Sequence, residues 1–490
     1  MKVNDLLELE VRDVVLGGKA LARHEGRVVF LDRGLPGDRV SARVTRVKRA
    51  WAEARIERSL AASPLRVEAP CPHFRSGTCG GCRFQDFPYE EQLALKERQV
   101  RETLEHLGGV REPAVRAIRP APETTGYRNK MEFSFHPGED GTPLIGLHQH
   151  GTFEAVFELE SCILPGALTL EVLRLTQRFA REHRWRAYHP RRHEGVARHL
   201  TVRHLPHTAQ CAVHLVAASD ELPELEEWAR AVAALSSEVR TVTLLLNRSR
   251  ANVAYGEEER TLVGDGAIVE RLLGLEFEAT AGTFLQTNSR QAEALYGAAL
   301  EAAALRGGET VLDLYCGTGT LTLLLARAAR LAVGVESVPE AIERARRNAE
   351  RNGAANVHFV AGEARPVLRA WARGERAAPW AAETASRPAL GAGETGKIGA
   401  IASTAARDSA AAGPQVVVVD PPRAGLHPRV VFRVAELNPE RIVYVSCNPA
   451  TLARDLKDFA GHGWRLAEVT PFDMFPHTPH IECVARLERG

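Results

Sequence analysis

The chain has 490 residues, of which 44% are hydrophobic and 26% are charged, and its formal net charge is +1. This length is too great for one hydrophobic core, so we expect a globular protein of two to four domains. The start of the chain lacks a signal-peptide pattern, and the most apolar later stretch, 321–335, is interrupted by Arg327 and Arg330. We therefore expect a cytoplasmic protein without a membrane span. The net charge by itself says nothing about a nucleic-acid partner.

Residues 1–60 alternate short β-rich runs with turns that contain Gly and Pro. This spacing predicts a small five-stranded barrel of the OB type. The segment carries thirteen Lys and Arg against nine Asp and Glu, and several of the cations cluster next to Trp51. Because cations attract phosphates and aromatic rings stack on bases, the barrel is a candidate RNA-binding domain. A solvated barrel with scattered charges would contain the same residues.

Three cysteines follow the barrel: Cys71, Cys79 and Cys82, the last two as a Cys-x-x-Cys pair with glycines between them. In a reducing compartment, the eight cysteines of this chain indicate metal binding or catalysis before disulfides. Three thiolates need a fourth ligand, and Cys162 is the best candidate. Four cysteines could hold zinc or an iron–sulfur cluster, and the spacing does not choose between them.

We expect a central α+β domain over 61–270, although a helix predicted over 89–107 could pack on the domain that follows. Two stretches of the central region carry cations at or along predicted strands. These cations are Arg128, Lys130, Arg198 and Arg203. We predict that both stretches belong to a basic, RNA-facing surface.

From 271 to 490 buried strands alternate with helices, which predicts a doubly wound, Rossmann-like sheet. A strand over 310–315 leads into a loop that contains Gly317, and the next strand ends in Glu336. An acid nineteen residues after Gly317 is suitably placed to bind ribose hydroxyls. The loop lacks the full dinucleotide fingerprint, so S-adenosylmethionine, which has no phosphate, fits better than NAD.

Residues 373–414 are rich in Ala, Gly and Thr, and we interpret them as a flexible insertion without a catalytic part. Two later strands end in reactive groups: Asp420 within Asp-Pro-Pro-Arg, and Cys447 within Ser-Cys-Asn-Pro. The last strand begins at Glu482, and if this strand is antiparallel to its neighbours, it starts at the edge where they end. Ligands of open α/β sheets bind at the carboxyl ends of the strands, so we expect these groups to meet there. Cys447 is a candidate nucleophile, although most free cysteines are buried hydrophobic residues.

Taken together, the motifs of the second half resemble those of RNA uracil-5-methyltransferases. The segments that carry the resemblance are 284–286, 312–319, 420–425, 446–449 and 480–482. Residues 1–60 are similar to a TRAM domain, so the resemblance covers nearly the whole chain apart from the insertion. It implies an α/β fold: a Rossmann-like class I S-adenosylmethionine-dependent methyltransferase domain at 271–490, preceded by an OB-like TRAM barrel and a central α+β domain.

The resemblance also implies roles for individual residues. Cys447 would add to C6 of a uracil that has left its base stack, C5 would then take the methyl group, and Glu482 would remove the C5 proton. The predicted cofactor-binding residues are Gln286, Tyr315, Gly317, Thr320, Glu336, Glu363 and Asp420. Arg128 resembles a family position near the flipped base. Cysteine-bearing members of the family hold a [4Fe–4S] cluster, so the resemblance favours iron–sulfur over zinc for Cys71, Cys79, Cys82 and Cys162.

The barrel and the cysteines favour 23S ribosomal RNA over transfer RNA as the substrate, and a monomer is the default expectation. Two other functions remain open. Asp-Pro-Pro also occurs in RNA methyltransferases that act on exocyclic amino groups, and such enzymes need no thiol. The third possibility is a non-catalytic iron–sulfur scaffold that binds RNA, against which the complete set of site residues argues.

Overall fold

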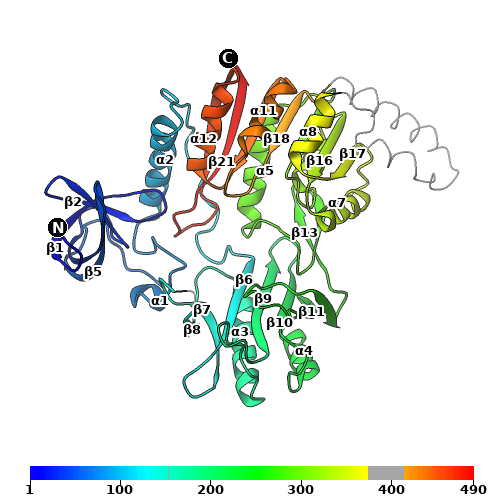
Figure 1. The fold of residues 1–490 in the computed structure, drawn as a ribbon. Helices are drawn as coiled ribbons and strands as arrows, with labels where there is room; N and C mark the ends of the chain where they lie inside the picture. Colours follow the sequence, from blue (N-terminus) through cyan, green and yellow to red (C-terminus); the bar gives the residue numbers. More distant parts are fainter. Residues whose placement is uncertain (153, 374–412) are drawn as a thin grey trace.

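The computed structural model describes residues 1–152, 154–373 and 413–490 (Figure 1). An N-terminal barrel, a central domain with an open sheet and a C-terminal domain with a second open sheet follow one another along the chain. The insertion predicted at 373–414 lies almost wholly outside the described residues. Within the described ranges, no helix combines the length and the apolar character that crossing a membrane would require.

The N-terminal segment forms the predicted closed barrel, with the strand order β1-β2-β3-β5-β4. Its strands are β1 (Leu6–Val14), β2 (Ala20–His24), β3 (Arg27–Leu31), β4 (Arg39–Val47) and β5 (Trp51–Ala61). Small and branched side chains such as Ala22, Val29 and Ala42 fill the interior and are fully buried. Outside the core, the Arg46 guanidinium lies over the ring of Trp51, 5.7 Å from its centre.

The central domain is built on a seven-stranded sheet with the order β12-β11-β10-β9-β6-β7-β8. The strands are β6 (Lys130–Pro137), β7 (Pro143–His148), β8 (Val156–Glu158), β9 (Ala197–Leu205), β10 (Gln210–Ala217), β11 (Val239–Leu246) and β12 (Glu258–Val263). The helices α3 (Ala167–Glu182) and α4 (Leu225–Ala233) pack on this sheet, and the side chains of Trp185 and Trp228 are buried in the shared core. A short helix, α1 (Pro72–Arg75), precedes the domain, and the hairpin β13 (Ile268–Leu272) and β14 (Leu275–Ala279) follows it.

The C-terminal domain contains the predicted doubly wound sheet, with the order β17-β16-β15-β18-β19-β21-β20. Its strands are β15 (Thr310–Leu314), β16 (Leu331–Glu336), β17 (Val357–Ala361), β18 (Val416–Val419), β19 (Arg441–Ser446), β20 (Trp464–Phe472) and β21 (Glu482–Arg489). The first five strands in this order are parallel, and the hairpin of β20 and β21 adds antiparallel to β19. The helices are α5 (Ser289–Ala303), α6 (Thr320–Ala326), α7 (Pro339–Arg351), α8 (Ala364–Ala372), α11 (Pro428–Glu436) and α12 (Pro449–Ala460).

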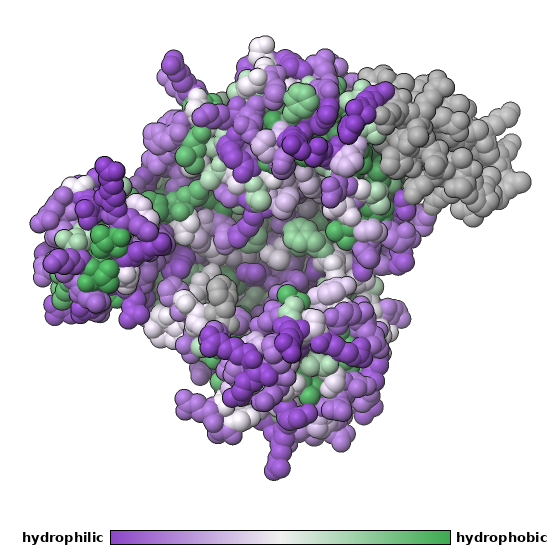
Figure 2. Space-filling model, viewed as in Figure 1, coloured by the Kyte–Doolittle hydropathy of each residue, from purple (hydrophilic) through white to green (hydrophobic). Residues whose placement is uncertain are grey.

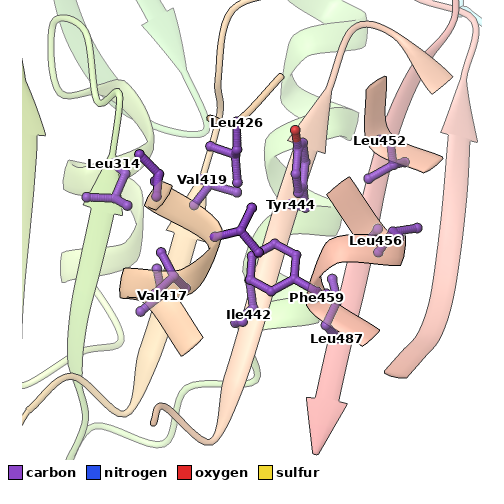
Figure 3. Packing of buried hydrophobic residues seen from close by; sticks show 14 of the residues in the cluster. Leu314, Val417, Val419, Leu426, Ile442, Tyr444, Leu452, Leu456, Phe459 and Leu487 are labelled. Carbon is purple, nitrogen blue, oxygen red and sulfur yellow. The ribbon is translucent and has the colours of Figure 1, made fainter. Parts of the chain in front are cut away.

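Helices cover both faces of this sheet, which explains why its central strands β15, β18 and β19 are almost wholly buried. Side chains alternate between the two faces along β19: Ile442 and Tyr444 belong to the core under α8, α11 and α12, whereas Val443 and Val445 belong to the core under α5, α6 and α7. Figure 3 shows Phe459 and Leu456 of α12 directed at the first of these faces.

The helix α2 (Tyr89–His106) comes from the N-terminal part of the chain but packs on the C-terminal domain (Figure 1). It contacts α12 and β20, and its Val100 and Leu104 are fully buried in the core of that domain. The helix predicted over 89–107 therefore packs on the C-terminal half of the chain. It connects the barrel to that half.

Candidate active site

The register of β19 and β21 places Cys447 across from Glu482. The two strands are antiparallel, and Ser446 pairs with Cys483. Cys447 is the next residue after Ser446, and Glu482 is the residue before Cys483, so the two side chains stand at the same edge of the sheet. Asn448 then caps α12 by accepting a hydrogen bond from the Ala450 amide at 3.1 Å. This cap holds Cys447 in the turn between strand and helix.

Burial and neighbouring charges disfavour ionisation of the acidic groups at this edge. Glu482 is 5% exposed, and burial, with a further contribution from Asp420, raises the pKa of its carboxyl to about 8. Burial raises the pKa of Asp420 to about 7. Burial, followed by the charges of Glu482 and Asp420, also raises the pKa of the Cys447 thiol. The charge of Asp420 thus acts on both the Cys447 thiol and the Glu482 carboxyl, which fits their common position at this edge of the sheet.

Arg423 supplies positive charge to this region and was not predicted as a site residue. Its charge acts against the raised pKa values of Cys447 and Glu482. Its guanidinium donates a hydrogen bond to Nδ1 of His480 at 2.9 Å. Burial and Arg423 together lower the pKa of His480 to about 4, so this imidazole is neutral. The sequence signal for Arg423 was its position at the end of Asp-Pro-Pro-Arg.

A cavity of about 310 Å³ opens at the carboxyl ends of β15, β16 and β17. Tyr315, Glu336 and Glu363 line it, as does His427, which the sequence analysis did not identify. One carboxylate oxygen of Glu336 accepts a hydrogen bond from the Gly317 amide at 3.3 Å. The other oxygen accepts from the two amides that follow Glu336 in the chain, so the carboxylate is held at the rim of the cavity.

The loop beside this cavity adopts a backbone conformation that few residues tolerate. Tyr315, Gly317 and Gly319 all have positive φ angles, of 66°, 54° and 82°. A Cβ atom on Gly319 would lie 2.8 Å from the ring of Phe359, so only glycine fits there. The positive φ of a tyrosine is a strained conformation of the kind that is common at functional sites.

The remaining predicted cofactor residues do not line this cavity. Thr320 is the first residue of α6 and is 8% exposed. Gln286 lies in the segment between β14 and α5, where its carbonyl accepts a hydrogen bond from Asn129 of the central domain at 2.9 Å. Asp420 directly follows β18 and belongs with Cys447 and Glu482, as described above. The predicted set is thus divided between the cavity and its surroundings.

The four predicted metal-binding cysteines come together around a second cavity, of about 350 Å³. They are Cys71, Cys79, Cys82 and Cys162, and all four line it. Burial raises the pKa of Cys82 to about 12 and that of Cys162 to about 11, and the other thiols of the group add to both shifts. Among the described residues, no group of three or more potential ligands is arranged around the position of a single metal ion.

Of the predicted RNA-binding cations, Arg128 and Lys130 line the cysteine cavity and are partly exposed. The prediction is wrong for Arg198 and Arg203, which are each 1% exposed. Arg198 donates hydrogen bonds to backbone carbonyls of the segment 247–251 and stacks on Tyr188. Arg203 donates to the carbonyl of Thr283 at 2.7 Å. Both arginines support the fold, because neighbouring segments cover the strand that carries them.

The sheet order, the glycine loop and the acid after the second strand define the class of protein: a Rossmann-like methyltransferase fold. Three family models match the chain. They are described as a TRAM domain, over residues 2–56, a methyltransferase domain, over 305–372, and tRNA (uracil-5-)-methyltransferase, over 412–490.

Relatives that match along the whole chain narrow the class to a family. An RNA methyltransferase of Chlorobaculum tepidum is 38% identical over 99% of this chain and 97% of its own length. One of Halalkalibacterium halodurans is 36% identical, with the same coverage. The crystal structure of Pyrococcus abyssi tRNA (uracil-54, C5)-methyltransferase in complex with S-adenosyl-L-homocysteine matches with a TM-score of 0.72 and 28% identity, covering 98% of this chain and 99% of that chain. The chain belongs to the RNA (uracil-5-)-methyltransferase family.

Proposed function

We propose that this protein methylates C5 of a uridine in RNA and that Cys447 and Glu482 perform the chemistry. The observation that carries the proposal is the strand register that puts the thiol across from the carboxyl at the edge where Asp420 also ends a strand. Uracil C5 is a poor nucleophile, so a group must first donate electrons into the ring. A thiolate at a strand end is suited to this task.

Cys447 and Glu482 have separate tasks in the reaction. The Cys447 thiolate adds to C6, which makes C5 nucleophilic. After C5 has been methylated, the Glu482 carboxylate accepts the C5 proton, and the electrons of the C5–H bond restore the C5–C6 double bond as the sulfur leaves. Arg423 favours the ionised forms of both groups, because its charge opposes the rise of their pKa values. Asp420 would contact either the uracil ring or the cofactor.

S-adenosylmethionine would supply the electrophilic methyl group. The cavity lined by Tyr315, Glu336 and Glu363 fits a nucleoside, because Glu336 lies at the end of the second strand, where an acid typically binds ribose hydroxyls. The related archaeal structure contains S-adenosyl-L-homocysteine, the demethylated product. Gln286, Gly317, Thr320 and Asp420 are proposed as further residues around this cofactor.

We propose an iron–sulfur cluster for the cysteine cavity. A mononuclear zinc site needs four sulfurs about 2.3 Å from one point, whereas a cubane holds its thiolates further apart. Four cysteines that line one cavity of about 350 Å³ would supply the four thiolates that such a cluster binds. Iron and acid-labile sulfide in protein purified without oxygen would support the cluster, and zinc in their place would refute it. Cys79→Ala should abolish the metal content, whereas Cys211→Ala, in β10, should not.

The target RNA follows less directly from the fold. We retain 23S ribosomal RNA as the proposed substrate and transfer RNA as the alternative. The archaeal enzyme named for transfer RNA matches 98% of this chain, so the domain order does not separate the two substrates. In the space-filling view the surface is hollowed between the C-terminal and central domains, where an RNA loop could enter (Figure 2). Methylation assays that offer both RNAs separately would decide between them.

The decisive experiment traps the protein on RNA that contains 5-fluorouridine. A base cannot remove fluorine from C5 as it removes a proton, so the sulfur cannot be eliminated. The bond between Cys447 and C6 should therefore persist when the protein is denatured. Peptide mapping should find the nucleotide on Cys447, and Cys447→Ala should form no adduct and transfer no methyl group. Methylation that survives in Cys447→Ala would instead favour an enzyme acting on exocyclic amino groups. Failure of the wild type to bind S-adenosylmethionine in calorimetry would favour a non-catalytic scaffold.

A further inference from the structure

The loop 473–481 determines where Glu482 stands. This loop connects β20 to β21, and its two ends are adjacent, because Phe472 and Glu482 are paired in the final hairpin. Asp473 is the first residue of the loop, one position beyond that pair. A change in the position of Asp473 is therefore passed to the strand pair that contains Glu482.

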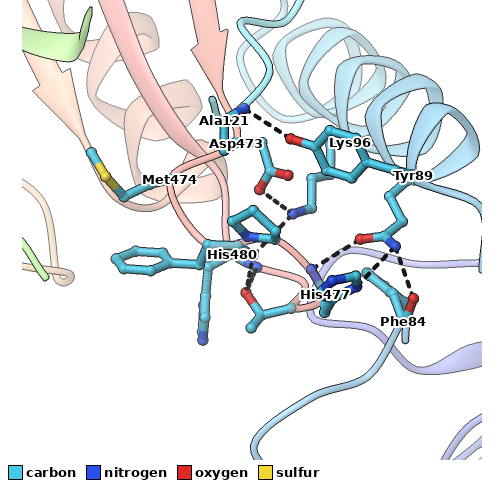
Figure 4. Close-up of polar contacts among 12 residues, drawn as sticks. Phe84, Tyr89, Lys96, Ala121, Asp473, Met474, His477 and His480 are labelled. Carbon is cyan, nitrogen blue, oxygen red and sulfur yellow. Dashed lines mark hydrogen bonds and ion pairs between the residues drawn. The ribbon is translucent and has the colours of Figure 1, made fainter. Parts of the chain in front are cut away.

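Helix α2 holds the beginning of this loop through a buried ion pair. The Lys96 ammonium lies 2.6 Å from a carboxylate oxygen of Asp473, and both side chains are 0% exposed (Figure 4). Lys96 also donates to the carbonyl of Phe475 at 3.4 Å. Two buried charges that neutralise each other fix their relative position strongly, since separating them leaves each one unpaired in a medium of low polarity.

Gln92, one turn earlier on α2, holds the middle of the same loop. Its side-chain oxygen accepts a hydrogen bond from the His477 amide at 3.0 Å, and its side-chain nitrogen donates to the carbonyls of Phe84 and Phe87, each at 2.8 Å. Gln92 is 0% exposed, so water cannot replace these bonds. One side chain thus ties the loop to the segment that follows the Cys-x-x-Cys pair.

Other domains contact the loop as well. The hydroxyl of Tyr127, at the edge of the central domain, donates to the carbonyl of Pro476 at 3.1 Å. Gly18 of the barrel packs so closely on Pro479 that a Cβ atom there would lie 3.1 Å from the proline ring. The loop before Glu482 is therefore where the barrel, the central domain and α2 meet the methyltransferase sheet.

We propose that Lys96 and Gln92 are positioning residues for Glu482, which they place through the loop 473–481 for removal of the C5 proton. The inference rests on the proposed function. Neither side chain is placed at the reacting atoms, and both act through the backbone of the loop. Proton removal depends on Lys96 and Gln92 more strongly than RNA binding, thiol addition and methyl transfer do. Those other steps use Cys447 and the cofactor cavity, which lie on other strands.

A defect confined to proton removal should leave a distinctive product that can be measured. If only proton removal is slow, C5 is already methylated while the bond between Cys447 and C6 remains, so methylated RNA stays attached to the protein. The test uses two variants, Gln92→Met and the double variant Lys96→Met with Asp473→Asn, which removes both buried charges together. With ordinary RNA we expect kcat to fall about 10- to 100-fold, KM for RNA to change less than about twofold, and a denaturation-resistant adduct that carries the transferred methyl group to accumulate.

The matched control is Arg98→Met on the same helix. Arg98 also pairs with a carboxylate, Asp13 of the barrel, but this pair is exposed and does not reach the loop. The control should retain the wild-type kcat and show no adduct. Loss of activity without adduct in both test variants, or equal accumulation of adduct in Arg98→Met, would overturn the inference. If the wild type methylates no RNA, or if methylation persists in Cys447→Ala, the proposed function is refuted instead.

Discussion

Asp420 lies close enough to Glu482 for its charge to add to the effect of burial, and together they raise the pKa of the Glu482 carboxyl to about 8. Below that pH the carboxyl is mostly protonated and cannot accept the C5 proton. The pKa of the Cys447 thiol is raised as well, so the thiolate also becomes more abundant as the pH increases. We expect kcat/KM to rise between about pH 6.5 and pH 8.5, as measured by transfer of a labelled methyl group.

The contribution of Asp420 to this profile can be tested separately. In Asp420→Asn the neighbouring negative charge is absent, so the pKa of Glu482 should fall and the rising limb should move to lower pH. The maximal rate could also fall, since Asp420 is a proposed ligand of the uracil or the cofactor, and only the midpoint of the limb is therefore compared. A midpoint that is unchanged or higher would contradict this prediction.

A second prediction concerns the stability cost of burying Glu482. Because the folded-state pKa of about 8 exceeds the ordinary value of 4.5 for a glutamate carboxyl, the folded state favours the protonated carboxyl. The resulting destabilisation is absent below about pH 4.5 and grows as the pH rises towards 8. Glu482→Gln should therefore raise the free energy of unfolding by a few kcal/mol at about pH 8.5, with a smaller gain at pH 5.5.

Thermal or denaturant unfolding at the two pH values measures this difference. Glu301→Gln is the control, since Glu301 is exposed on α5 and its replacement should leave the stability nearly unchanged at both. A gain in Glu482→Gln that is equal at both pH values would show that ionisation of this carboxyl is not its cause. The same variant should lose turnover, so stability and activity change in opposite directions.

A third prediction tests the cofactor cavity. Glu336→Gln keeps the size of the side chain but removes the charge that the amides of Gly317, Ser337 and Val338 now hold in place. Hydrogen bonds to a charged group contribute about 1.5–3 kcal/mol, so the Kd for S-adenosylhomocysteine should rise about 10- to 100-fold in calorimetry. Glu340→Gln, exposed in the first turn of α7, should bind normally. Unchanged affinity in Glu336→Gln would place the nucleoside elsewhere.

The sequence predicted the groups at strand ends because apolar runs with abrupt polar ends are local patterns. Cys447, Asp420 and Glu336 were found in this way, and the alternation of Ile442 and Val443 between two cores follows the same rule. That Cys447 stands across from Glu482 required the register of β19 and β21, which no local pattern specifies.

Interactions between distant segments could not be predicted. Lys96 and Asp473 are 377 residues apart, and a lysine on an amphipathic helix normally indicates a solvated face. The same limit explains the error at Arg198 and Arg203. Cations that alternate along a strand look the same whether that face is open to solvent or, as here, covered by another segment.

Replacing the buried Arg198 and replacing the exposed Arg46 of the barrel should have different effects on stability and on RNA binding. Arg198→Met would leave the buried carbonyl of Asn247 and the partly buried carbonyl of Ser249 without their donor, so the free energy of unfolding should fall by about 2–4 kcal/mol. The salt dependence of RNA binding should not change, because this guanidinium is inaccessible to phosphates.

Arg46→Met, which removes an exposed cation beside Trp51, should have the opposite effects. Stability should be retained, whereas the slope of log affinity against log salt should decrease by about 0.7–0.9 if Arg46 contacts one phosphate. Filter binding at several salt concentrations measures the slope, and a reduced slope in Arg198→Met would reinstate this residue as part of the RNA-facing surface.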